Sequence, residues 1–239
     1  MNYTGKIIVE NGDGVVEEHD WGQLNKLLCR ETTGDERFTF GEAHYAAGGA
    51  RGPVSGHEAF HCLSGEGTLT AWPQHGAGEE PVTVTLKAGS EFYVRGDVRR
   101  TVQSREAEPL FGIFMYCHVD RPCHTHYFSH EPGQGNDLHY HGRDKWVEPL
   151  RQEFVEAMYL VEGPGCIASA DARNHRVQDY EIAEGSAVYH PLNTLHRQYH
   201  PGTSERANFW IHAGFYSGEG RTTAGVFELP EVAVWRKPR

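Results

Sequence analysis

Long apolar runs and an excess of positive charge are both missing from this chain of 239 residues. The longest obvious apolar stretch, Leu110–Cys117, falls well short of the roughly 20 residues that a membrane helix needs. The first ten residues lack the apolar segment of a signal peptide and already include an acid, Glu10. Lys and Arg number 22 against 33 Asp and Glu, a net charge of −11, whereas a phosphate backbone selects clustered basic residues. We therefore expect a cytoplasmic protein that binds neither nucleic acid nor membrane.

The chain also has few cysteines, but it has many histidines. The five cysteines are odd in number and lack the spacing of a disulfide framework, so they predict free thiols in a reducing compartment. The 16 histidines are an excess. Because neutral imidazole is the commonest metal ligand in proteins, this excess directs the search toward a metal site.

Short apolar segments separated by 28 Gly and 12 Pro predict an all-β protein. One helix is expected near the N-terminus, because Trp21, Leu24, Leu27 and Leu28 share one helical face and Asp20 suits its N-cap. The clearest strand candidates are bounded by turn residues and are Arg37–Tyr45, Val82–Leu86, Glu91–Arg95, Pro109–Tyr116, Tyr180–Ala183 and Ala207–Phe215.

An internal repeat divides the chain in two. Glu58–Gly67 resembles Glu156–Gly165, with Glu-Ala and Gly-x-Gly in register at an offset of 98 residues. Lys87–Glu91 resembles Ala183–Ala187 at an offset of 96 residues. Two matches at nearly one offset indicate duplication of a unit the size of a small barrel. We place the domains at residues 1–120 and 121–239.

Histidines of the second half carry the chemistry. His139 and His141 stand two residues apart, so on a strand they share one face and can bind one metal ion; a surface or core pair is the alternative. Downstream, the stretch from Gly185 to His196 reads as a strand, a turn at Pro191, and a histidine that opens the next strand. The turn can aim His196 back at the first pair.

These motifs resemble the cupin superfamily: His-x-His, then Glu with Gly seven residues later, then Gly-x5-Pro-x4-His. The resemblance covers both halves and identifies a bicupin, with two tandem jelly-roll barrels and few short helices. It implies a metal-free N-terminal barrel and a C-terminal barrel that holds one divalent transition metal. The implied ligands are His139, His141, Glu156 and His196, a set that suits Fe(II), Mn(II), Ni(II) or Zn(II).

The position of the carboxylate ligand leaves an alternative open. Fifteen residues separate His141 from Glu156, more than the family pattern has, and an inserted loop accounts for the difference. A helix from Pro149 through Met158 would instead remove Glu156 from the barrel wall and leave Glu148, or no carboxylate, as the ligand. We favour a strand, because the repeat partner of this segment has no helical stripe.

The first half has the glycines and the glutamate of the motifs but lacks their histidines. If Glu58 points into its barrel, strand alternation turns His57 and His61 outward. Arg99 or Arg100 occupies the place of the second-motif histidine. We expect a metal-free supporting barrel, with anion binding by one of these arginines as the alternative.

Three further residues are candidates for contact with the ligands or the substrate. Gln198 and His200 follow His196 at strand spacing and share its face. Tyr159 is a further candidate, ahead of Trp210 and His212. The His/Cys cluster from Cys117 to His126 has no second cysteine pair at zinc-site spacing, so we interpret it as linker packing between the barrels.

The resemblance supports three functions. We favour an Fe(II)-type dioxygenase that acts on a small organic molecule, in a monomer or homodimer. The runner-up is a metal-dependent isomerase, lyase or amidohydrolase of a sugar or keto acid. A non-catalytic binding cupin is the third.

Overall fold

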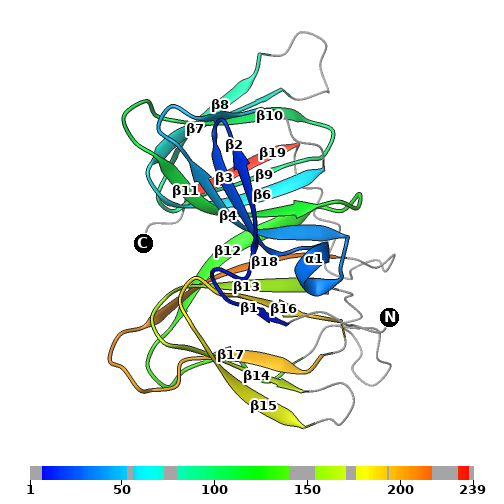
Figure 1. Cartoon of the computed structure of the whole chain (residues 1–239), viewed down its shortest axis with the longest axis vertical. Coiled ribbons are helices and arrows are strands. Elements are labelled where there is room, and N and C mark those ends of the chain that lie inside the picture. The colour runs from blue at the N-terminus through cyan, green and yellow to red at the C-terminus, as the bar shows by residue number, and fades with distance from the viewer. Residues whose placement is uncertain are drawn as a thin grey trace.

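The computed structural model describes residues 7–52, 56–72, 80–139, 154–170, 176–192, 194–216 and 231–236. Its strands form two barrels that lie one above the other, and the one helix among these residues is the short α1 (Arg30–Thr33), which lies beside them (Figure 1). The all-β, two-barrel prediction is confirmed. Among the described residues, no helix has the length and apolar character needed to cross a membrane.

The first barrel consists of a seven-stranded sheet, in the order β19-β9-β6-β11-β4-β3-β2, and a four-stranded sheet, β5-β10-β7-β8. All of their pairings are antiparallel. The strands are β2 (Val15–His19), β3 (Gly22–Leu28), β4 (Phe38–Tyr45), β5 (Ala50–Arg51), β6 (His57–Ser64), β7 (Glu66–Trp72), β8 (Val82–Lys87), β9 (Ser90–Val94), β10 (Arg99–Ser104), β11 (Leu110–Cys117) and β19 (Val232–Arg236).

The second barrel consists of a five-stranded sheet, β1-β16-β13-β18-β12, and a three-stranded sheet, β15-β14-β17, again antiparallel. Its strands are β1 (Ile8–Val9), β12 (Cys123–His130), β13 (Phe154–Glu162), β14 (Gly165–Ala170), β15 (Val177–Ile182), β16 (Ala187–His190), β17 (His196–Tyr199) and β18 (Asn208–Tyr216).

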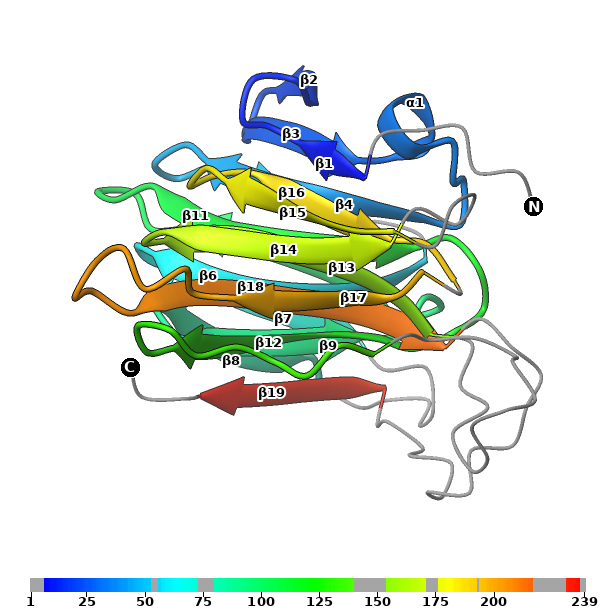
Figure 2. The same cartoon turned by 90° about the horizontal axis from the view of Figure 1, so that it is seen from below.

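The strands near the two ends of the chain cross the division expected between residues 120 and 121. β1 pairs with β16 of the second barrel, and β19 pairs with β9 of the first barrel. Figure 2 shows β19 at one edge of the molecule and β1 near the opposite edge. The division itself falls between β11 and β12, so every other strand stays in its expected half.

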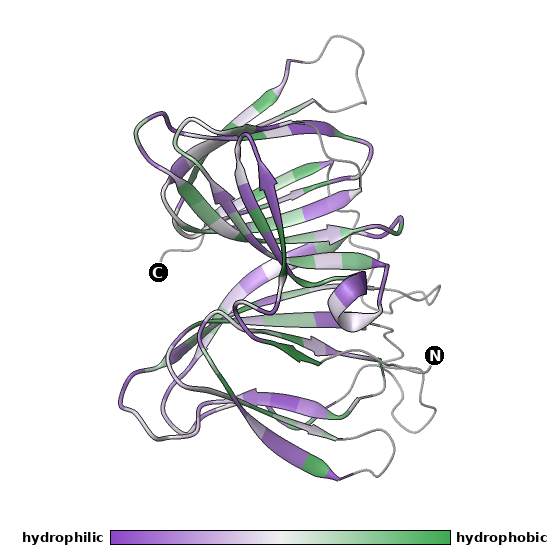
Figure 3. Ribbon diagram, viewed as in Figure 1, coloured by the Kyte–Doolittle hydropathy of each residue, from purple (hydrophilic) through white to green (hydrophobic). Residues whose placement is uncertain are grey.

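Three apolar clusters hold the molecule together. The largest lies between the barrels, where outward side chains of the seven-stranded sheet, such as Phe38 and Phe40, meet those of the five-stranded sheet, such as Ile211 and Phe215. A second cluster fills the first barrel. The third, inside the second barrel, has only six buried members among the described residues. Figure 3 shows the mainly hydrophilic colour of β17, and its His196 and Gln198 are buried. Together with the buried Glu156 on β13, they make the interior of the second barrel partly polar.

The expected N-terminal helix is wrong. The segment is β3, which forms a hairpin with β2 and pairs with β4. Its register with β4 shifts between Lys26 and Leu28, and a bulge of this kind places two consecutive side chains on the buried side. Leu24, Leu27 and Leu28 are consequently all buried, and their spacing of three and four residues imitates a helical stripe.

The repeat and the strand predictions are confirmed. Gly65 and Gly163 adopt φ of 80° and 86°, and Gly89 and Gly185 adopt 81° and 83°. A left-handed backbone of this kind favours glycine, so both halves use it at equivalent turns. All six strand candidates correspond to strands of the structure, with ends that differ by a few residues. The segment around Glu156 is strand β13, so the alternative helix through Met158 is wrong.

Candidate metal site in the second barrel

Glu156 meets two of the predicted histidines inside the second barrel. Candidate ligand atoms of His139, Glu156 and His196 all lie within 4.8 Å of one another. His196 Nε2 is 2.7 Å from Glu156 Oε2, and both side chains are almost wholly buried. Reciprocal backbone hydrogen bonds between His139 and His196 bring the first-motif histidine onto the start of β17. Residues far apart in sequence thus converge as the motif spacing predicts.

Backbone carbonyls fix the orientation of both imidazoles. His139 Nδ1 lies 2.7 Å from the carbonyl of Asp137, and His196 Nδ1 lies 2.7 Å from the carbonyl of Thr194. Because a carbonyl only accepts, each Nδ1 carries the proton and donates it. Each neutral ring therefore keeps the lone pair on Nε2, the state in which imidazole binds a metal.

This donor set fits a divalent transition metal. When His196 is neutral its Nε2 has no proton to donate, so Nε2 and Glu156 Oε2, 2.7 Å apart, can both bind one cation that lies beside them. Two imidazoles and one carboxylate are an established set for such ions and leave positions for other ligands. His141 and Glu148 lie outside the described residues.

A pocket of about 510 Å³ opens beside this group. Its described lining contains no Lys or Arg. The lining residues are His124, His126, Phe128, Ser129, His130, Asn136, His139, Phe154, Glu156, Met158 and His212.

A second histidine cluster lies on the other side of Glu156. Candidate ligand atoms of His124, His126 and His212 are also within 4.8 Å of one another. His212 Nδ1 is 3.0 Å from His126 Nδ1, and His212 Nε2 is 3.1 Å from Glu156 Oε1. Burial and the two neighbouring imidazoles lower the pKa of His124 to about 3. The linker interpretation of His124 and His126 is therefore wrong, because both lie on β12 and face the barrel interior; their own spacing of two residues was the signal for this.

A chain of side-chain amides runs behind the predicted ligands. Asn136 Nδ2 donates to Gln198 Oε1 at 3.0 Å, and Gln198 Nε2 donates to His190 Nε2 at 2.9 Å. Asn136 Oδ1 is left to accept from His130 Nε2 at 3.1 Å. His190 stacks on His196, with ring centroids 3.9 Å apart. Gln198 therefore supports a predicted ligand through His190 and does not touch it.

The other two candidate contacts lie elsewhere. His200 uses both ring nitrogens on its own loop, accepting from Gly202 N and donating to the carbonyl of Arg206. Tyr159 points out of the barrel, because strand alternation places it opposite Glu156, and it donates to Glu42 Oε1 at 2.6 Å across the interface between the barrels. Neither position is in contact with the pocket.

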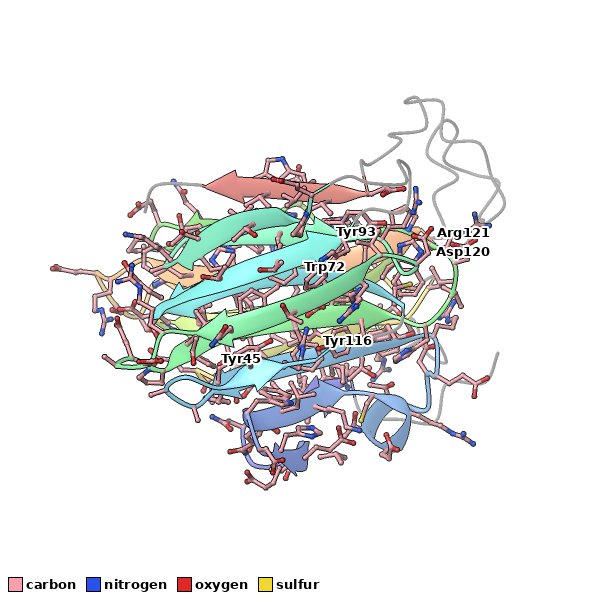
Figure 4. The ribbon with its side chains drawn as sticks, turned by 90° about the horizontal axis from the view of Figure 1, so that it is seen from above. Tyr45, Trp72, Tyr93, Tyr116, Asp120 and Arg121 are labelled. Carbon is pink, nitrogen blue, oxygen red and sulfur yellow. The ribbon has the colours of Figure 1, made fainter. Side chains whose placement is uncertain are left out.

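In the first barrel, two guanidinium groups contact the carboxylate that corresponds to Glu156. Glu58, the repeat partner of Glu156, has a wholly buried side chain and accepts from Arg100 Nε at 2.6 Å and from Arg51 Nη2. Arg51 also donates to Tyr116, which is labelled in Figure 4. Burial opposes ionisation of Glu58, but the two charges hold its pKa below the usual value. Arg100 is thus neutralised internally, which contradicts its role as an anion-binding group.

His57 and His61 point away from that interior, as strand alternation requires. His57 lies between the Tyr93 hydroxyl, at 2.6 Å, and Asp120 Oδ1, at 3.1 Å (Figure 4). His61 Nδ1 donates to Glu91 at 2.8 Å. The five cysteines are all free and buried, as predicted.

No model of a known protein family matches the chain, and no curated protein sequence resembles it. Solved structures do. A variant of oxalate decarboxylase from Bacillus subtilis is similar at a TM-score of 0.68 and 10% identity, with 88% of this chain and 77% of that one covered. The formate complex of oxalate decarboxylase from Lactobacillus farciminis is similar at a TM-score of 0.70 and 9% identity, with 90% and 87% covered. A second Bacillus subtilis variant has a TM-score of 0.68 at 10% identity, with 98% and 90% covered. At such low identity the likeness establishes the fold alone, which has the two tandem barrels that the motifs predicted.

Proposed function

We propose that this chain is a metal-dependent enzyme that converts a small organic anion in the pocket of its second barrel. One observation carries the proposal: two imidazoles with Nδ1 fixed on carbonyls direct Nε2 toward a buried carboxylate. The ligands in this proposal are His139, Glu156 and His196, with His141 as the fourth. The family resemblance, the unlike first barrel and the described geometry all support a cation in the second barrel alone.

The pocket restricts the substrate. A divalent cation held there would polarise an oxygen of the substrate and match its negative charge. The described lining offers no Lys or Arg for that purpose. Phe128, Phe154 and Met158 supply apolar walls, so the pocket suits a short molecule with one or two carboxylates.

Carbon–carbon cleavage is the reaction that we favour. The similar solved structures are oxalate decarboxylases, and the Bacillus subtilis enzyme is described with Mn(II) centres. In a decarboxylation the bond to the carboxylate breaks, carbon dioxide leaves, and the remaining carbon keeps the electron pair and takes a proton. His130 is the proton-handling group in this proposal, since it lines the pocket, donates Nε2–H to Asn136, and has no partner for Nδ1 among the described residues.

A dioxygenase with Fe(II) is the second candidate. It is favoured by the ligand set itself, because two His and one carboxylate with open positions are typical of non-haem iron oxygenases. In this case substrate oxidation is coupled to the uptake of molecular oxygen.

One experiment distinguishes these reactions. Protein loaded with Mn(II), and separately with Fe(II), is incubated with short-chain dicarboxylates and 2-oxo acids while carbon dioxide release and oxygen uptake are recorded together. Carbon dioxide without matching oxygen uptake supports the lyase, and equimolar oxygen uptake supports the dioxygenase. His139→Ala and His196→Ala are each expected to remove activity and to weaken metal binding, whereas His61→Ala leaves both unchanged. A bound-metal stoichiometry and affinity that neither ligand substitution changes refute the proposed site.

A further inference from the structure

The histidine cluster beside Glu156 is unexplained by a single metal ion. His124, His126 and His212 come from two neighbouring strands, β12 and β18, and His126 is paired directly with His212. His124 is paired with Gly214, which in turn is paired with Glu156 on β13. His124, Gly214 and Glu156 thus lie side by side on three neighbouring strands, and the ring of Phe154 covers Gly214.

Ring geometry identifies which nitrogen atoms are available. Glu156 Oε1 lies 3.1 Å from His212 Nε2 and can only accept, so a neutral His212 that carries its proton on Nε2 keeps a lone pair on Nδ1. His126 Nδ1 lies 3.0 Å from that atom, where the two nitrogens can share a hydrogen bond or a cation. Two nitrogen ligands at about 2.1 Å from one cation and at right angles lie about 3.0 Å apart. The spacing of these two atoms is therefore that of adjacent ligands of one ion.

Stacking against neighbouring rings holds the three imidazoles in place. Phe154 stacks on His124 and on His212, with ring centroids 5.5 Å apart in both cases. His124 also stacks on His126, at 5.8 Å. His212 is tilted against both rings, with ring centroids 5.4 Å from His124 and 4.3 Å from His126. An imidazole that keeps a lone pair on one nitrogen can bind a cation there.

We propose that His124, His126 and His212 form a second cation site, which is linked to the first through the 3.1 Å contact between His212 Nε2 and Glu156 Oε1. A carboxylate that accepts from the far nitrogen of a ligating histidine is a recurrent device that orients the ring and raises its basicity. Glu156 thus serves both sites: Oε2 faces His196, and Oε1 holds His212. The pocket touches all three rings, so the second cation reaches the substrate pocket.

The linkage makes the two sites interdependent. Replacing Glu156 by Gln removes a ligand from the first site and the acceptor of His212 from the second. A single substitution at Glu156 is therefore expected to weaken both sites, whereas His126→Ala weakens the second site and His196→Ala the first. Loss of one such orienting partner typically weakens metal binding about 10- to 100-fold.

Titration of the full chain with Mn(II), after removal of metal by chelator, tests the proposal. Bound Mn(II) is measured by elemental analysis, and free Mn(II) by electron paramagnetic resonance. Wild-type protein is expected to bind about two ions per chain, and His126→Ala and His196→Ala about one each. His126→Gln repeats the test with a smaller change of packing, His61→Ala is the matched control, and thermal melting confirms that each variant is folded.

The outcomes separate this inference from the proposed function. One ion that is lost in His196→Ala and kept in His126→Ala overturns the second site and leaves the proposed function standing. One ion that is lost in His126→Ala and kept in His196→Ala supports the second site and overturns the proposed function's ligand set. Two ions with a spin-coupled signal, abolished by either substitution, support the linked pair.

Discussion

Removing the Glu58 carboxylate tests whether the first barrel has replaced a metal by guanidinium groups. In Glu58→Gln, Arg51 and Arg100 remain buried and lose the charge that balances them. Breaking a buried ion pair by removing one partner costs about 3–5 kcal/mol. The exposed pair of Glu162 and Arg206, with side chains 45% and 67% exposed, is the control. There Glu162→Gln is expected to cost at most about 1 kcal/mol.

Urea denaturation followed by circular dichroism measures the difference. With a slope near 3 kcal/mol per molar, as suits a chain of this size, Glu58→Gln lowers the midpoint by about 1–2 M. The effect also depends on pH. Because the pKa of Glu58 lies below its unfolded value, its contribution to stability is present above about pH 4.5 and is lost as the pH falls through the folded pKa. In Glu58→Gln the free energy of unfolding should therefore fall less steeply as the pH is lowered below about 4.5. Equal destabilisation by Glu58→Gln and Glu162→Gln would refute the reasoning.

Three further outcomes are expected. Tyr159→Phe removes the hydrogen bond to Glu42 and should cost about 1.5–3 kcal/mol in unfolding free energy while bound metal is unchanged; loss of metal without loss of stability contradicts the placement of Tyr159. Gln198→Leu leaves the buried His190 Nε2 without its donor and removes the acceptor of the exposed Asn136, and should lower stability by about 1–3 kcal/mol, measured as a shift of the melting midpoint. Burial raises the pKa of Asp35, but hydrogen bonds from Arg37 and other partners outweigh it and lower the pKa. The stabilisation by ionised Asp35 is present above about pH 4 and is lost in acid. Asp35→Asn should therefore lower the melting midpoint at pH 7 and have little effect near pH 3.

The alternation of apolar and polar residues, and motifs that recur in both halves, predicted much of the fold correctly. The repeat, six strands and the convergence of His139, Glu156 and His196 follow from alternation and from turn residues that both halves share. The failed helix shows the limit of periodicity. A bulge at Leu27 displaced the alternation by one residue, and no sequence pattern distinguishes that from a helical stripe.

The histidines of β12 were misplaced for a different reason. His124 and His126 follow a Pro and lie beside cysteines, so composition suggested a linker, whereas strand pairing with β18 makes them part of the barrel wall. Tyr159 was misplaced because both faces of β13 are buried. One lines its own barrel and the other packs against the first barrel, and the sequence does not distinguish them. The sequence showed that an arginine, Arg100, stands where the motif has a histidine. It did not show that Arg100 donates a hydrogen bond to Glu58.

The exchange of strands β1 and β19 makes the two halves mutually dependent. Cutting the chain after residue 120 gives an N-terminal fragment without β19, which leaves β9 with an open edge, and a C-terminal fragment without β1, which leaves β16 with one. Open edges of this kind invite pairing with other chains. Duplication thus produced two barrels that neither fragment can complete alone, and the fragments should recover a native fold only when they are mixed.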